Sequence, residues 1–132
     1  MSQDRKTVKI LSFIAFAMGV ALLVVGIMDL VGHAGPWETS QVIEVAGDFT
    51  LCLLLVASSV FGIKGANRPS AIDPLLASTL LGALCAVGYG VAAAVFRSDH
   101  FVLEMVQAVV VFGFFVVWRV FAQRVVKARD RI

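Results

Sequence analysis

The sequence predicts an all-α fold, an integral membrane four-helix bundle in antiparallel, up-down-up-down order with both termini cytoplasmic. Three observations predict it: an apolar composition, four apolar blocks of similar length, and a one-sided distribution of basic residues. Hydrophobic residues make up 60% of the 132 residues and charged residues only 15%, whereas soluble chains are about 45–50% apolar and about 25% charged. A soluble fold of this length cannot bury that much apolar surface, so we expect a single membrane domain spanning 1–132.

The apolar residues are gathered in four blocks, and each block predicts one membrane-spanning helix. A helix rises about 1.5 Å per residue, so roughly 22 residues reach about 32 Å, close to a hydrocarbon core of about 30 Å. Strands are excluded because the blocks lack the alternation of polar and apolar residues that a barrel wall shows. The predicted helices cover about 10–31, 42–63, 75–96 and 101–122, and a basic C-terminal tail follows at 123–132.

The basic residues predict the orientation, because short cytoplasmic loops collect Lys and Arg. Ten of the eleven basic residues precede the first block, separate the second from the third, or end the fourth. With three acidic residues they give the predicted cytoplasmic side a net charge of +7. The outer side has six acidic residues and only Arg97, which gives −5. The predicted location is therefore a cytoplasmic membrane of bacterial type, crossed several times.

A signal peptide is the competing interpretation of the first block. Gly32, His33 and Ala34 offer small residues at the two positions that a signal peptidase requires. The block is longer than the 7 to 15 apolar residues of a signal sequence, and more predicted spans follow it. A spanning helix is the better interpretation.

The connections and the tail add two expectations. Only RSDH, 97–100, separates the third and fourth predicted helices, so these must be antiparallel neighbours. Asp73 before Pro74 is a helix-start signal, so the third helix begins nearby. The tail is expected to continue the fourth helix and to lie against anionic lipid headgroups. A cytoplasmic binding partner for the tail is the alternative.

Small residues spaced by four mark helix contact faces in lipid, where close approach rather than hydrophobic exclusion drives association. The third predicted helix is therefore a candidate for the bundle centre or for a protein interface. The fourth differs, because aromatic residues are spread around it, and we expect it to be peripheral and partly lipid-facing, with Arg119 reaching the headgroups. The predicted packing residues of the third helix are Ser78, Gly82, Ala86, Gly90 and Ala94.

Acidic residues inside the predicted spans are the main candidates for function. Glu44 and Asp48 lie four residues apart, so helical periodicity places them on one face. Asp48 is expected to face protein, because a carboxylate facing lipid costs about 2.5 to 3.5 kcal/mol at mid-membrane. Counting from the outer helix ends places the other polar side chains at similar or shallower depth. The candidate ion-binding residues are Asp48, Glu44, Glu104, Gln107 and Asp29.

These residues suggest an acidic, outward-facing vestibule built from the first, second and fourth helices, with His33 and His100 on the loops above it. Such a cluster binds a cation or holds a shared proton, since neighbouring carboxylates do not all ionise cheaply. The sequence does not indicate which metal, if any, it takes. In the alternative interpretation the shallower acids sit among the headgroups, and Asp48 bonds to Gln107 or Ser59 to fix the helix register.

Two further motifs favour packing over chemistry. Residues 87–90 spell VGYG, as in a potassium-channel filter, but they lie inside an unbroken span, and Ala86 stands where that filter has threonine. Cys52 and Cys85 fall at similar depth and would suit a quinone-linked thiol pair. Catalytic dithiols usually form a CxxC motif, however, and lone buried cysteines are usually inert.

The remaining signals concern function. HExxH, P-loop, GxSxG and dinucleotide motifs are absent from the sequence, and neither histidine lies within a predicted helix where it could hold haem. We therefore expect no enzyme, no cofactor and no nucleic-acid partner. The expected role is an interaction, assembly or accessory subunit, with lipids and a second copy or another membrane protein as partners. The alternative is a small ion- or proton-coupled transporter that uses the outer-side carboxylates. It would differ from four-helix transporters built on a deep acid in the first helix, because Asp29 ends that helix.

Overall fold

The computed structural model describes residues 3–32, 35–96 and 101–130, and it is all-α. Each of its four α-helices is long and apolar enough to cross a membrane, which confirms an all-α chain with four candidate spans. A single turn of 3-10 helix, η1, connects the second and third. The elements are α1 (Gln3–Val31), α2 (Thr39–Asn67), η1 (Pro69–Ala71), α3 (Asp73–Phe96) and α4 (Phe101–Asp130).

The helices are longer than the apolar blocks that predicted them. α1 begins at Gln3, and α4 continues through the basic tail to Asp130. Hydropathy detects only the part of a helix suited to lipid, whereas the backbone hydrogen bonds continue through the charged residues on either side. α2 begins with a capping box, in which the backbone N–H of Glu38 donates to Gln41 Oε1 at 3.1 Å. As expected, α3 begins at Asp73.

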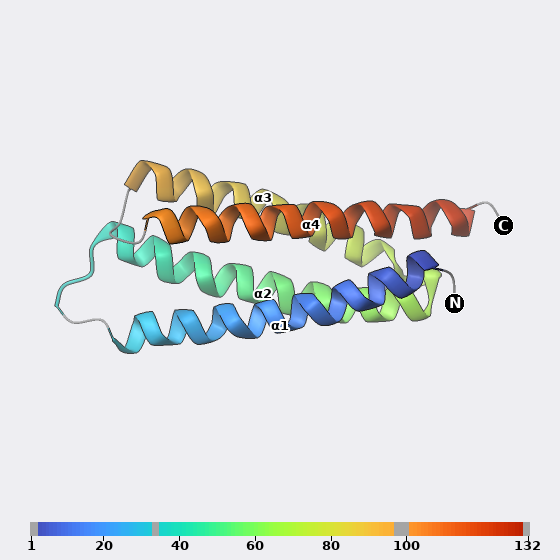
Figure 1. Ribbon diagram of the computed structural model, residues 1–132, viewed down its shortest axis with the longest axis horizontal. Coiled ribbons are helices and arrows are strands. Elements are labelled where there is room, and N and C mark those ends of the chain that lie inside the picture. The colour runs from blue at the N-terminus through green and yellow to red at the C-terminus, as the bar shows by residue number, and fades with distance from the viewer. Residues whose placement is uncertain (1–2, 33–34, 97–100, 131–132) are drawn as a thin grey trace.

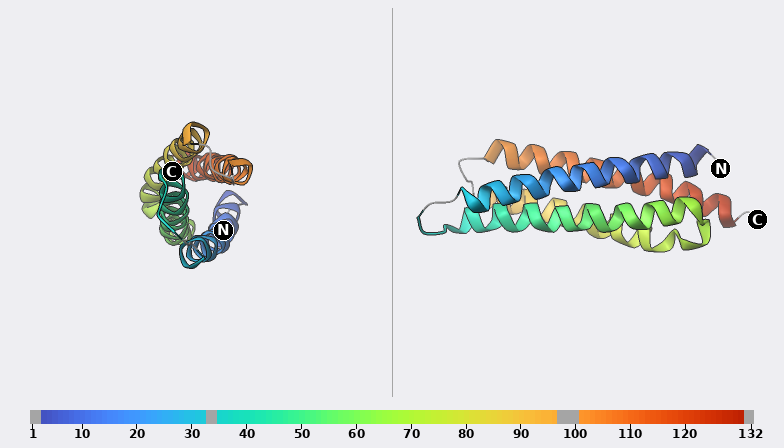
Figure 2. Two further views of the ribbon diagram at one scale, coloured as in Figure 1. Left: turned by 90° about the vertical axis from the view of Figure 1, so that its left-hand side faces the viewer. Right: turned by 90° about the horizontal axis from the view of Figure 1, so that it is seen from below.

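The four helices lie side by side along one axis, and the two ends of the chain lie at the same end of the bundle (Figure 1). In the end-on view they follow a curved line rather than a filled square (Figure 2). α1 packs most extensively on α2, and α3 on α4. α2 and α3 join the two pairs and bury a larger share of their spans than α1 and α4 do.

Contacts between successive helices run in opposite senses along the chain. Arg5 near the start of α1 donates to the carbonyl of Ala66, near the end of α2, at 2.7 Å. Gly26 near the end of α1 instead lies beside Asp48 in the first half of α2, where an added Cβ would be 3.4 Å from the Cβ of Asp48. The same reversal relates α3 to α4. Arg129 pairs with Asp73 at 3.5 Å, and Tyr89 donates to Gln107 further along the bundle.

The largest fully buried side chains belong to α4. Trp118 and Phe115 have no exposed surface, and their rings stack with centroids 6.2 Å apart. Phe112 by contrast is 40% exposed. α4 is partly exposed, as expected of a peripheral helix, but two of its aromatic side chains face inward. The sequence shows rings around most of the helix but does not show which side faces α2 and α3.

The predicted packing stripe of α3 faces α4 over its middle section. A Cβ at Gly82 would lie 2.5 Å from the Phe115 ring, and one at Gly90 would lie 3.3 Å from the Ala108 methyl group. Ala86 between them is fully buried. The two ends of the stripe are less enclosed, since Ser78 is half-buried and donates to the Leu75 carbonyl, while Ala94 is exposed.

Candidate functional site

Four acidic residues from three helices meet in the half of the bundle away from the chain ends. α1 contributes Asp29, α2 contributes Glu44 and Asp48, and α4 contributes Glu104. Asp48 is close enough to the other three to interact electrostatically with each. Glu44, Asp48 and Glu104 are 9%, 1% and 2% exposed. We call these four residues the carboxyl cluster.

Asp48 faces protein, as the cost of exposing a carboxylate to lipid predicts. Gly26 allows α1 to pack closely against Asp48, because glycine has no side chain to separate α1 from the Cβ of Asp48. Asp29 follows Gly26 by one turn on the same face of α1. Asp29 is also near enough to Asp48 for the two carboxyl groups to influence each other.

The carboxyl cluster contains acceptors that no donor reaches. Both carboxylate oxygens of Asp48 and the buried Oδ2 of Asp29 have no hydrogen-bond partner in the part of the chain that the structure describes. Glu44 and Glu104 differ, because each has an interaction partner. A buried polar group without a partner is costly, and a buried charge more so. The unsatisfied acceptors are therefore confined to Asp29 and Asp48.

The alternative interpretation, in which Asp48 bonds to Gln107 or Ser59, is wrong. Ser59 donates its hydroxyl to the Val56 carbonyl of its own helix at 2.6 Å. Gln107 accepts from Tyr89 through its Oε1 at 3.5 Å. Ser59 bonds within its own helix, because a short hydroxyl reaches its own backbone most easily, and Gln107 bonds across to Tyr89 of α3.

Tyr89 is the site residue that sequence reasoning missed. This tyrosine of α3 is 6% exposed and lies near enough to all four members of the carboxyl cluster for their charges to act on it. All four helices therefore contribute polar side chains to this region, rather than the three expected. A signal was present, since Tyr89 is the single tyrosine of the chain and lies at about the depth of Gln107. We read its flanking glycines, Gly88 and Gly90, as packing residues only.

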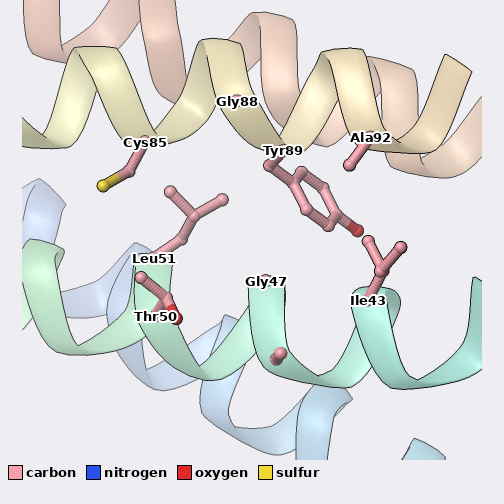
Figure 3. Close-up of a pocket in the computed structure, with 9 residues that line it drawn as sticks. Ile43, Gly47, Thr50, Leu51, Cys85, Gly88, Tyr89 and Ala92 are labelled. Atoms are coloured by element: carbon pink, nitrogen blue, oxygen red, sulfur yellow. The ribbon is translucent and has the colours of Figure 1, made fainter. Parts of the chain in front are cut away.

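A groove between α2 and α3 leads to Tyr89 from the outside of the bundle. Its cavity volume is about 290 Å³ and it is open on one side. The Tyr89 ring extends from α3 across to α2 and closes the groove at the end nearest Ile43 (Figure 3). The lining residues are Ile43, Ala46, Gly47, Thr50, Leu51, Cys85, Gly88, Tyr89 and Ala92.

Gly47 explains how the Tyr89 ring fits against α2. A Cβ at Gly47 would overlap Cδ2 and Cε2 of the ring, so only glycine permits this contact. Gly88 on the opposite wall meets nothing within 4 Å. Tyr89 therefore stands between the groove on one side and the carboxyl cluster on the other.

Neither a metal site nor a disulfide is found among the described residues. Within 3–32, 35–96 and 101–130 there is no group of three His, Cys, Asp or Glu side chains placed to hold a metal ion. His33 and His100, expected above the vestibule, lie outside the described residues, as does Arg97. Both cysteines are free thiols.

In the other half of the bundle, polar side chains donate to backbone carbonyls. The hydroxyls of Ser12 and Thr79 donate to carbonyls one turn earlier, at 2.8 and 2.9 Å. Arg119, expected to reach the headgroups, donates to the Leu76 carbonyl across the α3–α4 contact. Ser58 Oγ and Trp118 Nε1 are buried and without a partner among the described atoms. Neither of these two groups carries a charge.

Comparison with protein-family models, with curated proteins and with solved structures gives no match for this chain.

Proposed function

We propose that the chain is a multi-pass protein of the cytoplasmic membrane, with its helices in antiparallel, up-down-up-down order and both termini in the cytoplasm. The reversed contacts of successive helices support this order. Arg5, Lys9 and Arg129 are at the end of the bundle where the chain ends lie, and the carboxyl cluster is at the other. That polarity agrees with the tendency of cytoplasmic segments to collect basic residues.

We infer that the protein acts as a small proton- or cation-coupled transporter, with the carboxyl cluster as its coupling site. One observation carries this proposal: Asp48 is 1% exposed, and neither of its carboxylate oxygens has a donor among the described residues. An ionisable group inside a membrane span is costly and marks ion or proton pathways in many membrane proteins. A structural role would be served better by a side chain whose hydrogen bonds are satisfied.

The carboxyl cluster lies within reach of the outer side. Asp29 and Glu104 stand within one turn of the outer helix ends. Glu44 lies between one and two turns into α2, and Asp48 lies about one turn deeper than Glu44. A proton or cation entering from outside meets acidic side chains at successive depths. Its arrival removes the cost of burying an unpaired carboxylate, and its departure restores that cost. This difference between states is what a coupled transporter needs.

Reconstitution in liposomes tests the proposal. Purified protein is inserted into vesicles that contain a pH-sensitive dye, and proton flux is followed after a potential is imposed with valinomycin and potassium. We expect flux above that of empty vesicles, and at least a tenfold loss in Asp48→Asn. The matched control is Asp130→Asn, an exposed aspartate at the opposite end of the bundle. Flux equal to that of empty vesicles, with either proton or sodium gradients, would contradict the transporter role.

A non-enzymatic interaction, assembly or accessory subunit is the second candidate function. The observation that favours it is the open groove between α2 and α3, whose walls include Gly88 and Ala92. Small residues of this kind allow another transmembrane helix, from a second copy or from another membrane protein, to approach closely. Purification in mild detergent followed by mass spectrometry separates the candidates. A stoichiometric membrane partner retained by Asp48→Asn but lost in Gly88→Leu supports the accessory role.

A further inference from the structure

We propose that Asp29 and Asp48 form a carboxyl pair that binds one proton between them, and that this pair is the ligand site within the carboxyl cluster. The inference deepens the transporter proposal and rests on it for its biological meaning. It names the ligand as a proton and restricts the site to two of the four acids.

The backbone brings the two side chains together. A Cβ at Gly26 would lie 3.4 Å from that of Asp48, so α1 and α2 approach closely at this level. Asp29 is three residues beyond Gly26, which places it on the same face of α1 one turn nearer the outer side. The two aspartates are therefore placed on facing sides of the α1–α2 contact, about one turn apart along it.

The unpaired oxygens select these two residues. Asp48 Oδ1, Asp48 Oδ2 and Asp29 Oδ2 are the carboxylate oxygens that are buried and without a partner in the described structure. Glu44 and Glu104 contribute no such oxygen among the described residues, and each has an interaction partner. Two facing carboxylates are both acceptors and repel each other. One added proton turns one group into a donor, and the resulting O–H···O⁻ bond satisfies an oxygen on each residue.

The surroundings favour a proton over a metal ion. The titratable groups that face the pair are Glu44 on α2, Tyr89 on α3 and Glu104 on α4. Among the described residues, no Lys or Arg side chain acts on Asp48, and no group of three ligands suits a metal. A proton needs only the two carboxyl groups, whereas calcium takes six to eight oxygen ligands. The proton comes from water on the outer side and returns to water when the pair is ionised.

Infrared difference spectroscopy tests the pair without requiring transport. The protein is placed in lipid nanodiscs at neutral pH, and the C=O stretch of protonated carboxyl groups is compared in H₂O and D₂O. We expect an isotope-sensitive band in the wild type and its loss in both Asp48→Asn and Asp29→Asn. The Asp130→Asn control keeps the band. Size-exclusion profiles verify that each variant is folded, and the two independent substitutions keep the test decisive if one fails.

Several outcomes would overturn the proposal. A band that persists in both Asp29→Asn and Asp48→Asn places the proton on another residue. Absence of a protonated band in the wild type, together with carboxylate bands that shift on adding sodium chloride, indicates a cation site instead. Failure of the transporter proposal gives a different result from failure of the carboxyl pair. In that case the band is present and depends on both aspartates, but vesicle flux is absent. Flux that depends on Asp48 without the band contradicts the carboxyl pair alone.

Discussion

The two halves of the bundle treat buried polar groups in different ways. In the half near the chain ends, Ser12, Thr79 and Arg119 donate to backbone carbonyls, and two stacked rings fill the core. In the outer half, acidic side chains converge, and three carboxylate oxygens have no donor among the described residues. The first arrangement stabilises the fold. The second leaves carboxyl groups without donors, at a greater cost to stability than the neutral Ser58 hydroxyl and Trp118 indole N–H, which are also buried and unpartnered in the inner half.

Removal of the largest inner side chain should have the largest effect on stability. Trp118→Ala leaves a cavity among α1, α2 and α4, because the indole is fully buried and lies against Gly62. We expect a loss of about 3 to 5 kcal/mol in the free energy of unfolding, measured by denaturant titration in micelles. Trp37→Ala is the control, since Trp37 is 44% exposed and should lose less than about 1 kcal/mol. Equal losses would show that the inner half is not the stabilising half.

Adding a methyl group to the inner contact should have the next largest effect. A Cβ at Gly62 would overlap the Ser12 hydroxyl and lie 2.8 Å from the Trp118 ring. Gly62→Ala is expected to cost about 1 to 3 kcal/mol by overpacking. Gly113→Ala meets nothing within 4 Å and should be neutral or stabilising by up to about 1 kcal/mol. Thermal unfolding followed by tryptophan fluorescence compares the two variants, and a stable Gly62→Ala would mean that α1 and α2 separate easily here.

A methyl group at the outer groove should change function more than stability. Gly47→Ala displaces the Tyr89 ring, which has the open groove to move into, so we expect a loss of only about 1 kcal/mol. Displacement breaks the hydrogen bond from Tyr89 to Gln107. Proton flux in vesicles should therefore change in Gly47→Ala but not in Gly88→Ala, which adds the same methyl group to open space. Identical flux in both variants would remove Tyr89 from the site.

The smallest expected effect on stability is that of Asp48→Asn, and its sign is informative. The substitution keeps the shape of the side chain and removes the potential charge from a group without a donor. We expect no loss, or a gain of up to about 1 kcal/mol, in the free energy of unfolding. Chemical denaturation of the variant beside wild type measures it. A clear loss of stability would mean that Asp48 has a structural role and that the two halves do not differ in the way described.

Hydropathy and charge predicted much of this molecule because they reflect the membrane directly. Apolar blocks of spanning length predicted four helices, and the cost of a carboxylate in lipid predicted that Asp48 faces inward. The sequence did not predict which face of each helix points inward, because a helix that is apolar on all sides carries no amphipathic signal. For that reason the inward rings of α4 and the contribution of Tyr89 were missed. The hydrogen bond from Arg119 to Leu76 depends on the α3–α4 contact, which sequence periodicity does not specify.

The hydrogen bonds of Arg5 have a consequence for how the molecule is made. Its guanidinium donates to the carbonyls of Ala66 and Asn67, at 2.7 and 2.8 Å, and so fastens the beginning of α1 to the last turn of α2. These carbonyls would otherwise have no intrahelical donor. The α1–α2 hairpin is thus fastened at its open end by bonds that need neither α3 nor α4, so it can close before those helices are placed.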